Sequence, residues 1–158
     1  MLTGYYYRDD LTQKAFRDGW YLTGDFGFVQ EGEVFVSGRK KDMIIVGGRN
    51  VYPQDLESLT YEVSGVHAGR SVAFGLFDEE QGTEGVVIIA EVDSEDSDEQ
   101  QKVGDAIRLH VTKNSAIALR YVKVVDPKWI LKTSSGKTAR AANKEKFLAE
   151  LQAEQAKE

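Results

Sequence analysis

Residues 38–59 read GRKKDMIIVGGRNVYPQDLESL. The first five, residues 38–42, are polar or glycine and separate two apolar stretches, so we expect a boundary there. Residues 43–46 predict a short buried strand. The turn that follows, residues 47–50, begins with two glycines, which adopt positive φ without steric cost. The stretch therefore predicts a break in the chain followed by a new folding unit.

A helix is expected after this strand and turn. Pro53 suits the first turn of a helix, where its missing N–H has no consequence. Leu56, Leu59 and Val63 recur at helical spacing and would form one apolar face. We expect this helix to end near Gly65.

The chain before residue 38 has a different pattern. Residues 19–37 are rich in aromatic and β-branched side chains and are interrupted by the polar and glycine residues 30–33, which predicts a β-hairpin. Residues 8–17 have a short stretch of helix-like spacing. We expect this part of the chain to belong to something larger.

Strand and helix patterns follow one another after residue 65. In chain order we expect strands at 71–77 and 85–92, an acidic loop at 93–99, a helix with Val103, Ile107 and Val111 on one face, a strand at 121–125 and a helix from about residue 139. The Ser and Asp residues of the acidic loop are expected to cap the helix after it. The pattern predicts a compact α+β or α/β sandwich in which helices cover a small sheet.

Composition excludes several classes of function. The 158 residues include 20 Lys and Arg against 26 Asp and Glu, a net charge of −6, which argues against a general nucleic-acid or anionic-membrane binder. The chain has no cysteine, so disulfides and Cys-ligated metals are excluded, and we expect no metal site. No apolar run approaches a membrane span and the start lacks the pattern of a signal peptide, so a cytoplasmic location is expected.

Residues 131–138, LKTSSGKT, form the most distinctive polar segment. Lysines, hydroxyls and a glycine in a loop between a strand and a helix suit an anionic ligand such as phosphate. A P-loop would need another glycine five residues before Gly136, where this chain has Leu131. A polar turn that caps the last helix is the alternative interpretation.

Four motifs, this segment included, follow one another in the order and at the spacing of a known family. They are YLTGD at 21–25, SGRKKDMII at 37–45, residues 48–57 and KTSSGK at 132–137. Together they closely resemble the last third of the adenylate-forming enzymes, a superfamily that includes acyl-CoA synthetases, fatty-acyl-AMP ligases, peptide-synthetase adenylation domains and luciferases. The resemblance extends over residues 4–148 and is nearest to the acyl-CoA synthetase and fatty-acyl-AMP ligase branches.

The resemblance implies a domain organisation. Residues 1–38 would end a large N-terminal adenylation domain, residues 39–42 would form a hinge, and residues 43–158 would form the mobile C-terminal domain, an α+β fold with a small mixed sheet covered by helices. The ATP triphosphate loop and the acyl pocket would lie in the large domain. We therefore expect the chain to be a fragment that is inactive alone and that works with its own N-terminal domain.

The resemblance also assigns roles to single residues. Asp25 matches the aspartate that hydrogen-bonds both ribose hydroxyls of ATP and AMP, and Arg39 matches a second nucleotide contact. Lys137 matches the lysine that bridges the carboxylate oxygen and the α-phosphate during adenylation. Lys41 stands where the family pivots.

A second set of residues matches the thiol-transfer state. Gly47, Gly48 and Arg49 correspond to the turn that lines the pantetheine tunnel after the domain rotates. Glu57 matches a family position whose role is more structural than catalytic. Leu131 departs from the family, which usually has proline there.

The implied reaction joins a carboxylate to ATP, giving acyl-AMP and pyrophosphate, after which the thiol of CoA or of an acyl carrier protein displaces AMP. Mg²⁺ would be bound mainly by the large domain. These features are typical of fatty-acid metabolism. The alternative is a non-catalytic, stand-alone module that binds a carrier protein or regulates a ligase in trans. The presence of Asp25, Arg39 and Lys137 together favours the enzyme.

Overall fold

The computed structural model describes residues 3–156. It divides the chain after Lys41 into two compact units, called unit 1 and unit 2 below. A single turn of 3₁₀-helix, η1 (Lys40–Asp42), spans this point of the sequence.

Unit 1 contains one helix and two small antiparallel sheets. The elements are α1 (Asp9–Ala15), β1 (Phe16–Arg17) paired with β2 (Trp20–Tyr21), and β3 (Asp25–Gln30) paired with β4 (Glu33–Arg39). The predicted hairpin is present, but it extends over residues 25–39 and not 19–37. Gly24 has a φ of +76°, which turns the chain between β2 and β3. β2 therefore does not continue into the β3–β4 hairpin and pairs antiparallel with the preceding strand, β1.

Unit 2 contains a mixed three-stranded sheet, as predicted. Its elements are β5 (Ile44–Val46), β6 (Arg49–Val51), α2 (Pro53–Tyr61), β7 (Ser71–Asp78), β8 (Thr83–Glu91), α3 (Ser97–Ser115), β9 (Leu119–Val125) and α4 (Arg140–Gln155). The sheet order is β7-β8-β9, with β7 antiparallel and β9 parallel to β8. β5 and β6 form a separate hairpin.

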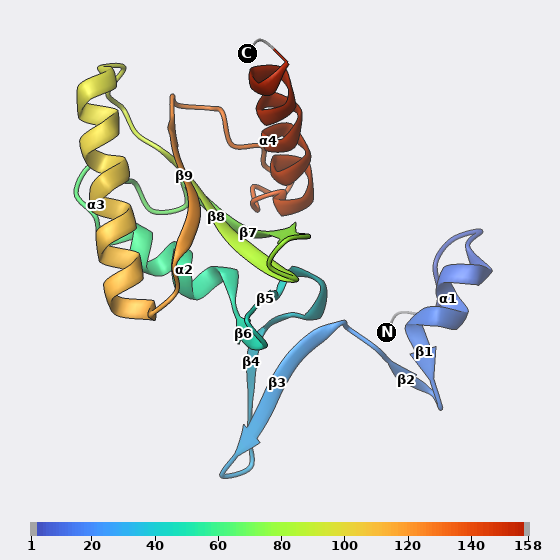
Figure 1. Cartoon of the computed structure of the whole chain (residues 1–158). Helices are drawn as coiled ribbons and strands as arrows, with labels where there is room; N and C mark the ends of the chain where they lie inside the picture. Colours follow the sequence, from blue (N-terminus) through green and yellow to red (C-terminus); the bar gives the residue numbers. More distant parts are fainter. Residues whose placement is uncertain (1–2, 157–158) are drawn as a thin grey trace. The chain divides into compact units, whose positions relative to one another are not determined.

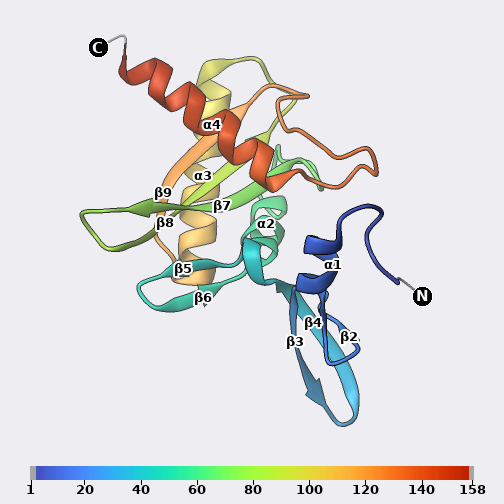
Figure 2. The same cartoon turned by 90° about the vertical axis from the view of Figure 1, so that its right-hand side faces the viewer.

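Helices cover both faces of this sheet (Figures 1 and 2). Successive side chains of a strand point to opposite faces, so β8 supplies Val86, Ile88 and Ala90 to one core and Val87 and Ile89 to the other. The first core is closed by α2, α3 and the β5–β6 hairpin, and the second by α4. The prediction of a small sheet covered by helices is confirmed.

The cap of α3 also agrees with the prediction from the acidic loop. The Asp96 carboxylate accepts hydrogen bonds from the backbone N–H groups of Asp98 and Glu99, at 2.9 and 3.0 Å. At the other end of the helix, Ala116 has a φ of +56°, and its N–H donates to the carbonyl of Thr112. Both ends of α3 are therefore fixed locally.

α4 is anchored by polar contacts along its length as well as by its apolar face. Glu150 accepts hydrogen bonds from Lys123 Nζ at 2.8 Å and from Trp129 Nε1 at 3.0 Å. Burial acts to raise the pKa of Glu150, but the bond to Lys123 and the surrounding cations outweigh it, so the pKa is lowered. Lys146 stacks over the Trp129 ring at 4.0 Å. These contacts fix the helix that follows the polar loop.

Among residues 3–156, no helix combines the length and apolar character needed to cross a bilayer.

Candidate functional site

The loop from Leu131 to Ala139 is closed at its base by one buried side chain. Asn143, in the first turn of α4, is fully buried. Its Oδ1 accepts from the Leu131 N–H at 2.8 Å, and its Nδ2 donates to the carbonyls of Leu131 and Ala139, both at 2.9 Å. The Ala139 N–H donates to the Leu131 carbonyl at 3.0 Å. The two ends of the loop are therefore tied to each other and to α4.

The segment leading into the loop is held in the same way. Glu91, at the end of β8, is 6% exposed and accepts from the Ile130 N–H at 2.6 Å. A buried carboxylate that accepts a backbone N–H ties this segment to the central strand. Both the sheet and α4 therefore support the base of the loop.

The tip of the loop presents Lys137 to solvent. A turn forms around Thr133, whose carbonyl accepts from the Gly136 N–H at 2.8 Å and whose N–H donates to the Lys137 carbonyl at 2.7 Å. Gly136 has a φ of +79°, which only glycine adopts without strain. Within the described part of the chain the Lys137 ammonium makes no ion pair. A firmly based loop thus carries a free cation.

We expect Asn143→Leu to destabilise unit 2 by about 2 kcal/mol, because the buried Leu131 N–H loses its acceptor and the carbonyls of Leu131 and Ala139 each lose one of two donors. The loop should also become more accessible. Denaturant unfolding of the 158-residue chain measures the first effect, and limited proteolysis between residues 131 and 139 measures the second. Asn143→Asp keeps the acceptor for the Leu131 N–H but places a carboxylate oxygen against two carbonyls in a fully buried site, so its loss should be at least as large. An unchanged proteolysis rate in Asn143→Leu would contradict the anchoring role.

A buried ion pair between α2 and α4 fixes the first residue of α4. Glu57 on α2 is 9% exposed, and its Oε1 accepts from Arg140 Nη2 and from the Ala73 N–H, both at 2.9 Å. Burial raises the pKa of Glu57, while the Arg140 charge and the Ala73 N–H act against the rise. This pair joins α2, β7 and the residue three positions after Lys137. The expected structural role of Glu57 agrees with this geometry.

Asp25 and Arg39 occupy paired positions at one end of the β3–β4 hairpin. Their side chains lie 3.4 Å apart (Arg39 Nε to Asp25 Oδ1) and both are accessible to solvent. A carboxylate accepts from two adjacent hydroxyls, and a guanidinium donates to phosphate oxygens. The pair therefore places one acceptor and one cationic donor side by side.

The Gly47–Gly48 turn is tighter than predicted. Gly47 and Gly48 have φ values of +55° and +79°, as in a two-residue hairpin loop. Arg49 and Asn50, expected in the turn, instead belong to β6, where they pair with Val46 and Ile45. Two glycines suffice to reverse the chain, so the next residues rejoin the ladder. A hollow of about 700 Å³ with a largely apolar lining flanks this turn.

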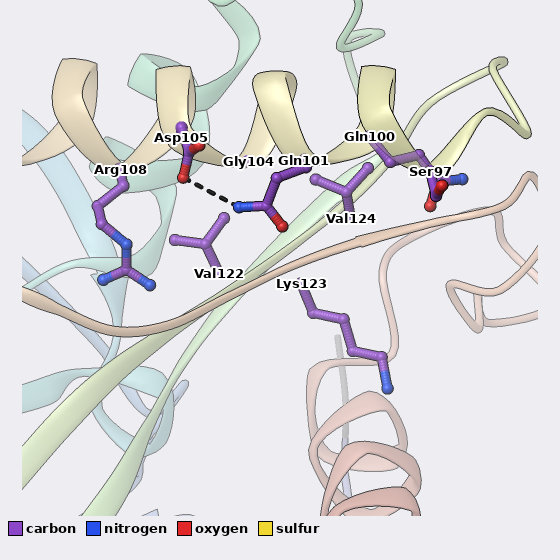
Figure 3. A pocket seen from close by; sticks show the side chains of 9 residues that line it. All are labelled: Ser97, Gln100, Gln101, Gly104, Asp105, Arg108, Val122, Lys123 and Val124. Carbon is purple, nitrogen blue, oxygen red and sulfur yellow. Dashed lines mark hydrogen bonds between the residues drawn. The ribbon is translucent and has the colours of Figure 1, made fainter.

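Another hollow, of about 280 Å³, lies between α3 and β9 (Figure 3). Several of its polar side chains have hydrogen-bond partners, most of them outside the lining. Gln101 Nε2 donates to Asp105 Oδ1 at 3.1 Å, Arg108 donates to the Leu119 carbonyl, and Lys123 is directed to Glu150 on α4. This hollow contains none of the predicted site residues.

No group of three or more His, Asp or Glu side chains within residues 3–156 is arranged to hold a metal ion.

Sequence reasoning did not identify three of the residues that build the site. Asn143 and Arg140 bind partners 12 and 83 residues away, so no local pattern marks them. The strand expected at residues 85–92 leaves out Thr83, which is the first residue of β8. A β-branched residue next to Gly82 was the only available signal.

Known proteins resemble this chain over most of its length. It is 38% identical to the medium-chain-fatty-acid–[acyl-carrier-protein] ligase JamA of Moorena producens, over 94% of this chain and 26% of the relative. The structure of McyG A-PCP complexed with phenylalanyl-adenylate matches with a TM-score of 0.84 and 36% identity, over 94% of this chain and 27% of that one.

A structure from a study of fatty acyl-adenylate ligases of E. coli and L. pneumophila matches with a TM-score of 0.79 and 28% identity, over 96% of this chain and 26% of that one. The chain therefore spans about a quarter of the length of the proteins it matches. No protein-family model matches it.

Proposed function

We propose that this chain is a C-terminal part of an adenylate-forming enzyme of the acyl-CoA synthetase and fatty-acyl-AMP ligase branch, and that the full-length protein is an ATP-dependent acyl-activating ligase. It joins a carboxylate to AMP with release of pyrophosphate and then passes the acyl group to a thiol. The observation that carries this proposal is the free cation of Lys137 on a loop anchored by Asn143 and Glu91.

Lys137 acts in the first half-reaction. As the carboxylate oxygen attacks the α-phosphorus, negative charge builds on the oxygens around the reacting centre. An ammonium group held near these oxygens stabilises the transition state more than the ground state. The long flexible side chain supplies reach, and the anchored loop supplies position.

Asp25 and Arg39 hold the nucleotide. The Asp25 carboxylate accepts from the ribose hydroxyls, and the Arg39 guanidinium lies beside it to contact the phosphate side. Mg²⁺, which the triphosphate carries, is bound mainly by residues of the large domain.

The thiol enters along the Gly47–Gly48 turn in the second half-reaction. The turn has no side chains, so a pantetheine arm approaches the backbone closely, and Arg49 follows at the start of β6. CoA and the phosphopantetheine of an acyl carrier protein present the same reactive end. JamA, whose name specifies a carrier protein, supports the carrier as acceptor.

Unit 1 is the end of the large adenylation domain, and residues 39–42 are the hinge. Both faces of the β3–β4 hairpin carry exposed apolar side chains, including Phe28, Val29, Val34 and Val36. A two-stranded hairpin is marginal alone, and such a surface calls for a covering partner. The preceding part of the full-length protein is the partner proposed here.

The test is carboxylate-dependent exchange of pyrophosphate into ATP. The full-length protein should catalyse exchange with at least one member of a panel of fatty, aryl and hydroxyaryl acids, whereas the 158-residue chain alone should remain at background. Exchange by the isolated chain would show that the domain content is wrong. A full-length protein that binds holo-carrier protein but never exchanges pyrophosphate would favour the non-catalytic module.

Lys41 is proposed as the pivot, which makes its backbone more important than its exposed side chain. Lys41→Ala should be mild. Lys41→Pro fixes φ near −65° and disfavours the helical geometry that Lys40 has in η1, so it should restrict rotation. We expect acyl-AMP formation to persist and thiol transfer to fall. Separate assays of the two half-reactions check this, and full thioester activity in Lys41→Pro would remove the pivot assignment.

A further inference from the structure

The β5–β6 hairpin leaves backbone groups of β5 without partners inside the hairpin. Val46 and Arg49 close the two-residue turn, and Ile45 with Asn50 is the next pair. Pairs in an antiparallel ladder alternate between bonded and non-bonded, so the N–H and C=O of Ile45 point away from β6. Both groups need partners from another element.

Two side chains at the start of β8 supply them. Glu84 Oε2 accepts from the Ile45 N–H at 2.6 Å. Thr83 Oγ1 donates to the Ile45 carbonyl at 3.0 Å and accepts from the Gly47 N–H at 2.7 Å. One hydroxyl thus binds both the strand and the first glycine of the turn. These three bonds take the place of a backbone ladder along the outer edge of β5.

The position of Glu84 depends on a glycine in the neighbouring strand. Glu84 lies opposite Phe77, and Gly75 is the next residue on the same face of β7. A Cβ at Gly75 would lie 2.6 Å from Glu84 Oε1 and 2.8 Å from Ile44 Cγ2. The space that glycine leaves allows the Glu84 carboxylate to cross β7 and reach β5.

Thr83 and Glu84 also lie in the wall of the hollow beside the turn. The lining residues are Ile45, Gly47, Gly48, Phe77, Gln81, Gly82, Thr83 and Glu84. Phe77 and Ile45 are 65% and 48% exposed, so the surface around the two polar side chains is open and apolar. A ligand that passes the turn would meet this surface.

We propose that Thr83 and Glu84 are positioning residues that hold the Gly47–Gly48 turn in the conformation that receives the thiol arm. This inference rests on the proposed function. Two glycines in sequence have wide conformational freedom, and a turn made of them needs outside contacts to stay in one state. The hydroxyl of Thr83 supplies the contact to the turn, and the carboxylate of Glu84 fixes the strand before it.

Backbone hydrogen exchange in the 158-residue chain tests the clamp without any activity. Thr83→Val has nearly the same shape but no hydroxyl, so the Gly47 amide should exchange about tenfold faster, whereas Thr83→Ser should keep the wild-type rate. Thr112→Val, on the exposed face of α3, serves as the matched control. Equal Gly47 exchange in wild type and Thr83→Val would overturn the proposal.

The functional arm uses the full-length protein with pantetheine as the thiol. Thr83→Val should raise the KM for pantetheine by about tenfold, with acyl-AMP formation and the thermal midpoint close to wild type, and Thr83→Ser should restore the KM. Glu84→Gln keeps an acceptor for the Ile45 N–H and should be milder than Glu84→Ala. Unchanged pantetheine kinetics in Thr83→Val, or equal losses in both half-reactions, would overturn the positioning role.

Failure of the proposed function would look different. A wild-type protein without carboxylate-dependent pyrophosphate exchange would count against the ligase. The Gly47 exchange rates would still decide whether the clamp holds the turn.

Discussion

Replacing Lys137 with alanine is expected to slow acyl-adenylate formation in the full-length protein by a factor of about 10²–10³, the usual loss when one preorganised donor to a developing anion is removed. The side chain is exposed on a loop whose base is fixed by Asn143 and Glu91, so its removal should leave the fold intact. Binding of the carboxylate and ATP should change much less than the rate, because the contact matters most in the transition state.

Lys132→Ala is the matched control. Lys132 is an exposed lysine of the same loop, and it pairs with Thr138 through the backbone, which the substitution leaves in place. It should retain near-normal adenylation. Single-turnover formation of acyl-AMP measures both variants. Equal losses in Lys132→Ala and Lys137→Ala would mean that general loop charge, and not this side chain, supports the reaction.

The second large effect concerns stability. Glu57→Ala should lower the free energy of unfolding of unit 2 by about 3–5 kcal/mol, because it leaves the Arg140 charge buried without its partner. The Arg140 side chain is 13% exposed and the Glu57 side chain 11%, so water replaces the lost contact poorly. The Ala73 N–H also loses its acceptor. Denaturant unfolding of the 158-residue chain is the measurement.

Two controls separate the charge from the packing. Gln54→Ala, at an exposed position of the same helix, should change stability little. The double variant Glu57→Leu/Arg140→Met removes both charges and should recover part of the loss, since no buried charge remains unpaired. If Glu57→Ala unfolded at the wild-type denaturant midpoint, the pair would not be the link between α2 and α4.

The pH dependence of this pair has a definite sign. Burial raises the pKa of Glu57 in the folded state, so the folded chain binds this proton more tightly than the unfolded chain. The stabilisation from this proton is full below the unfolded pKa of about 4.3 and is lost as the pH rises through the folded value. The unfolding free energy of wild type minus that of Glu57→Gln should therefore become more positive as the pH is lowered from 7. The opposite slope would contradict the burial argument.

Elements built on repeating patterns could be predicted from the sequence. The face of α2 that carries Leu56, and the face of α3 that carries Ile107 and Val111, are buried in one core, as helical spacing indicates. The acidic loop caps α3 through Asp96 because short carboxylates bind free N–H groups at a helix start.

Element boundaries that depend on backbone reversals could not be predicted from the sequence. The hairpin in unit 1 begins later than expected because Gly24 turns the chain. The φ value of a glycine within an aromatic run cannot be inferred from the sequence. Arg49 pairs in β6 because the Gly47–Gly48 turn needs no third residue. In both cases the composition marked a turn, but its length was set by geometry.

The chemistry-bearing residues divide in the same way. Lys137, Asp25 and Arg39 were identified because they lie in motifs that resemble a family. Asn143 and Arg140, which fix the Lys137 loop, bind groups from distant parts of the chain. Such contacts arise only when the sheet and α4 have assembled, and no helical or strand pattern in the sequence predicts them.

The central claim is that unit 2 serves the two half-reactions with different residues, and one crossed comparison tests it most directly. The rates of acyl-AMP formation and of thiol transfer from supplied acyl-AMP are measured in full-length Lys137→Ala and Gly48→Ala. A Cβ at Gly48 meets no described atom within 4 Å, so only its φ of +79° and the approach of the thiol oppose alanine there. We predict that Lys137→Ala loses the first rate and keeps the second, while Gly48→Ala keeps the first and loses part of the second. Parallel losses of both rates in both variants would contradict the account.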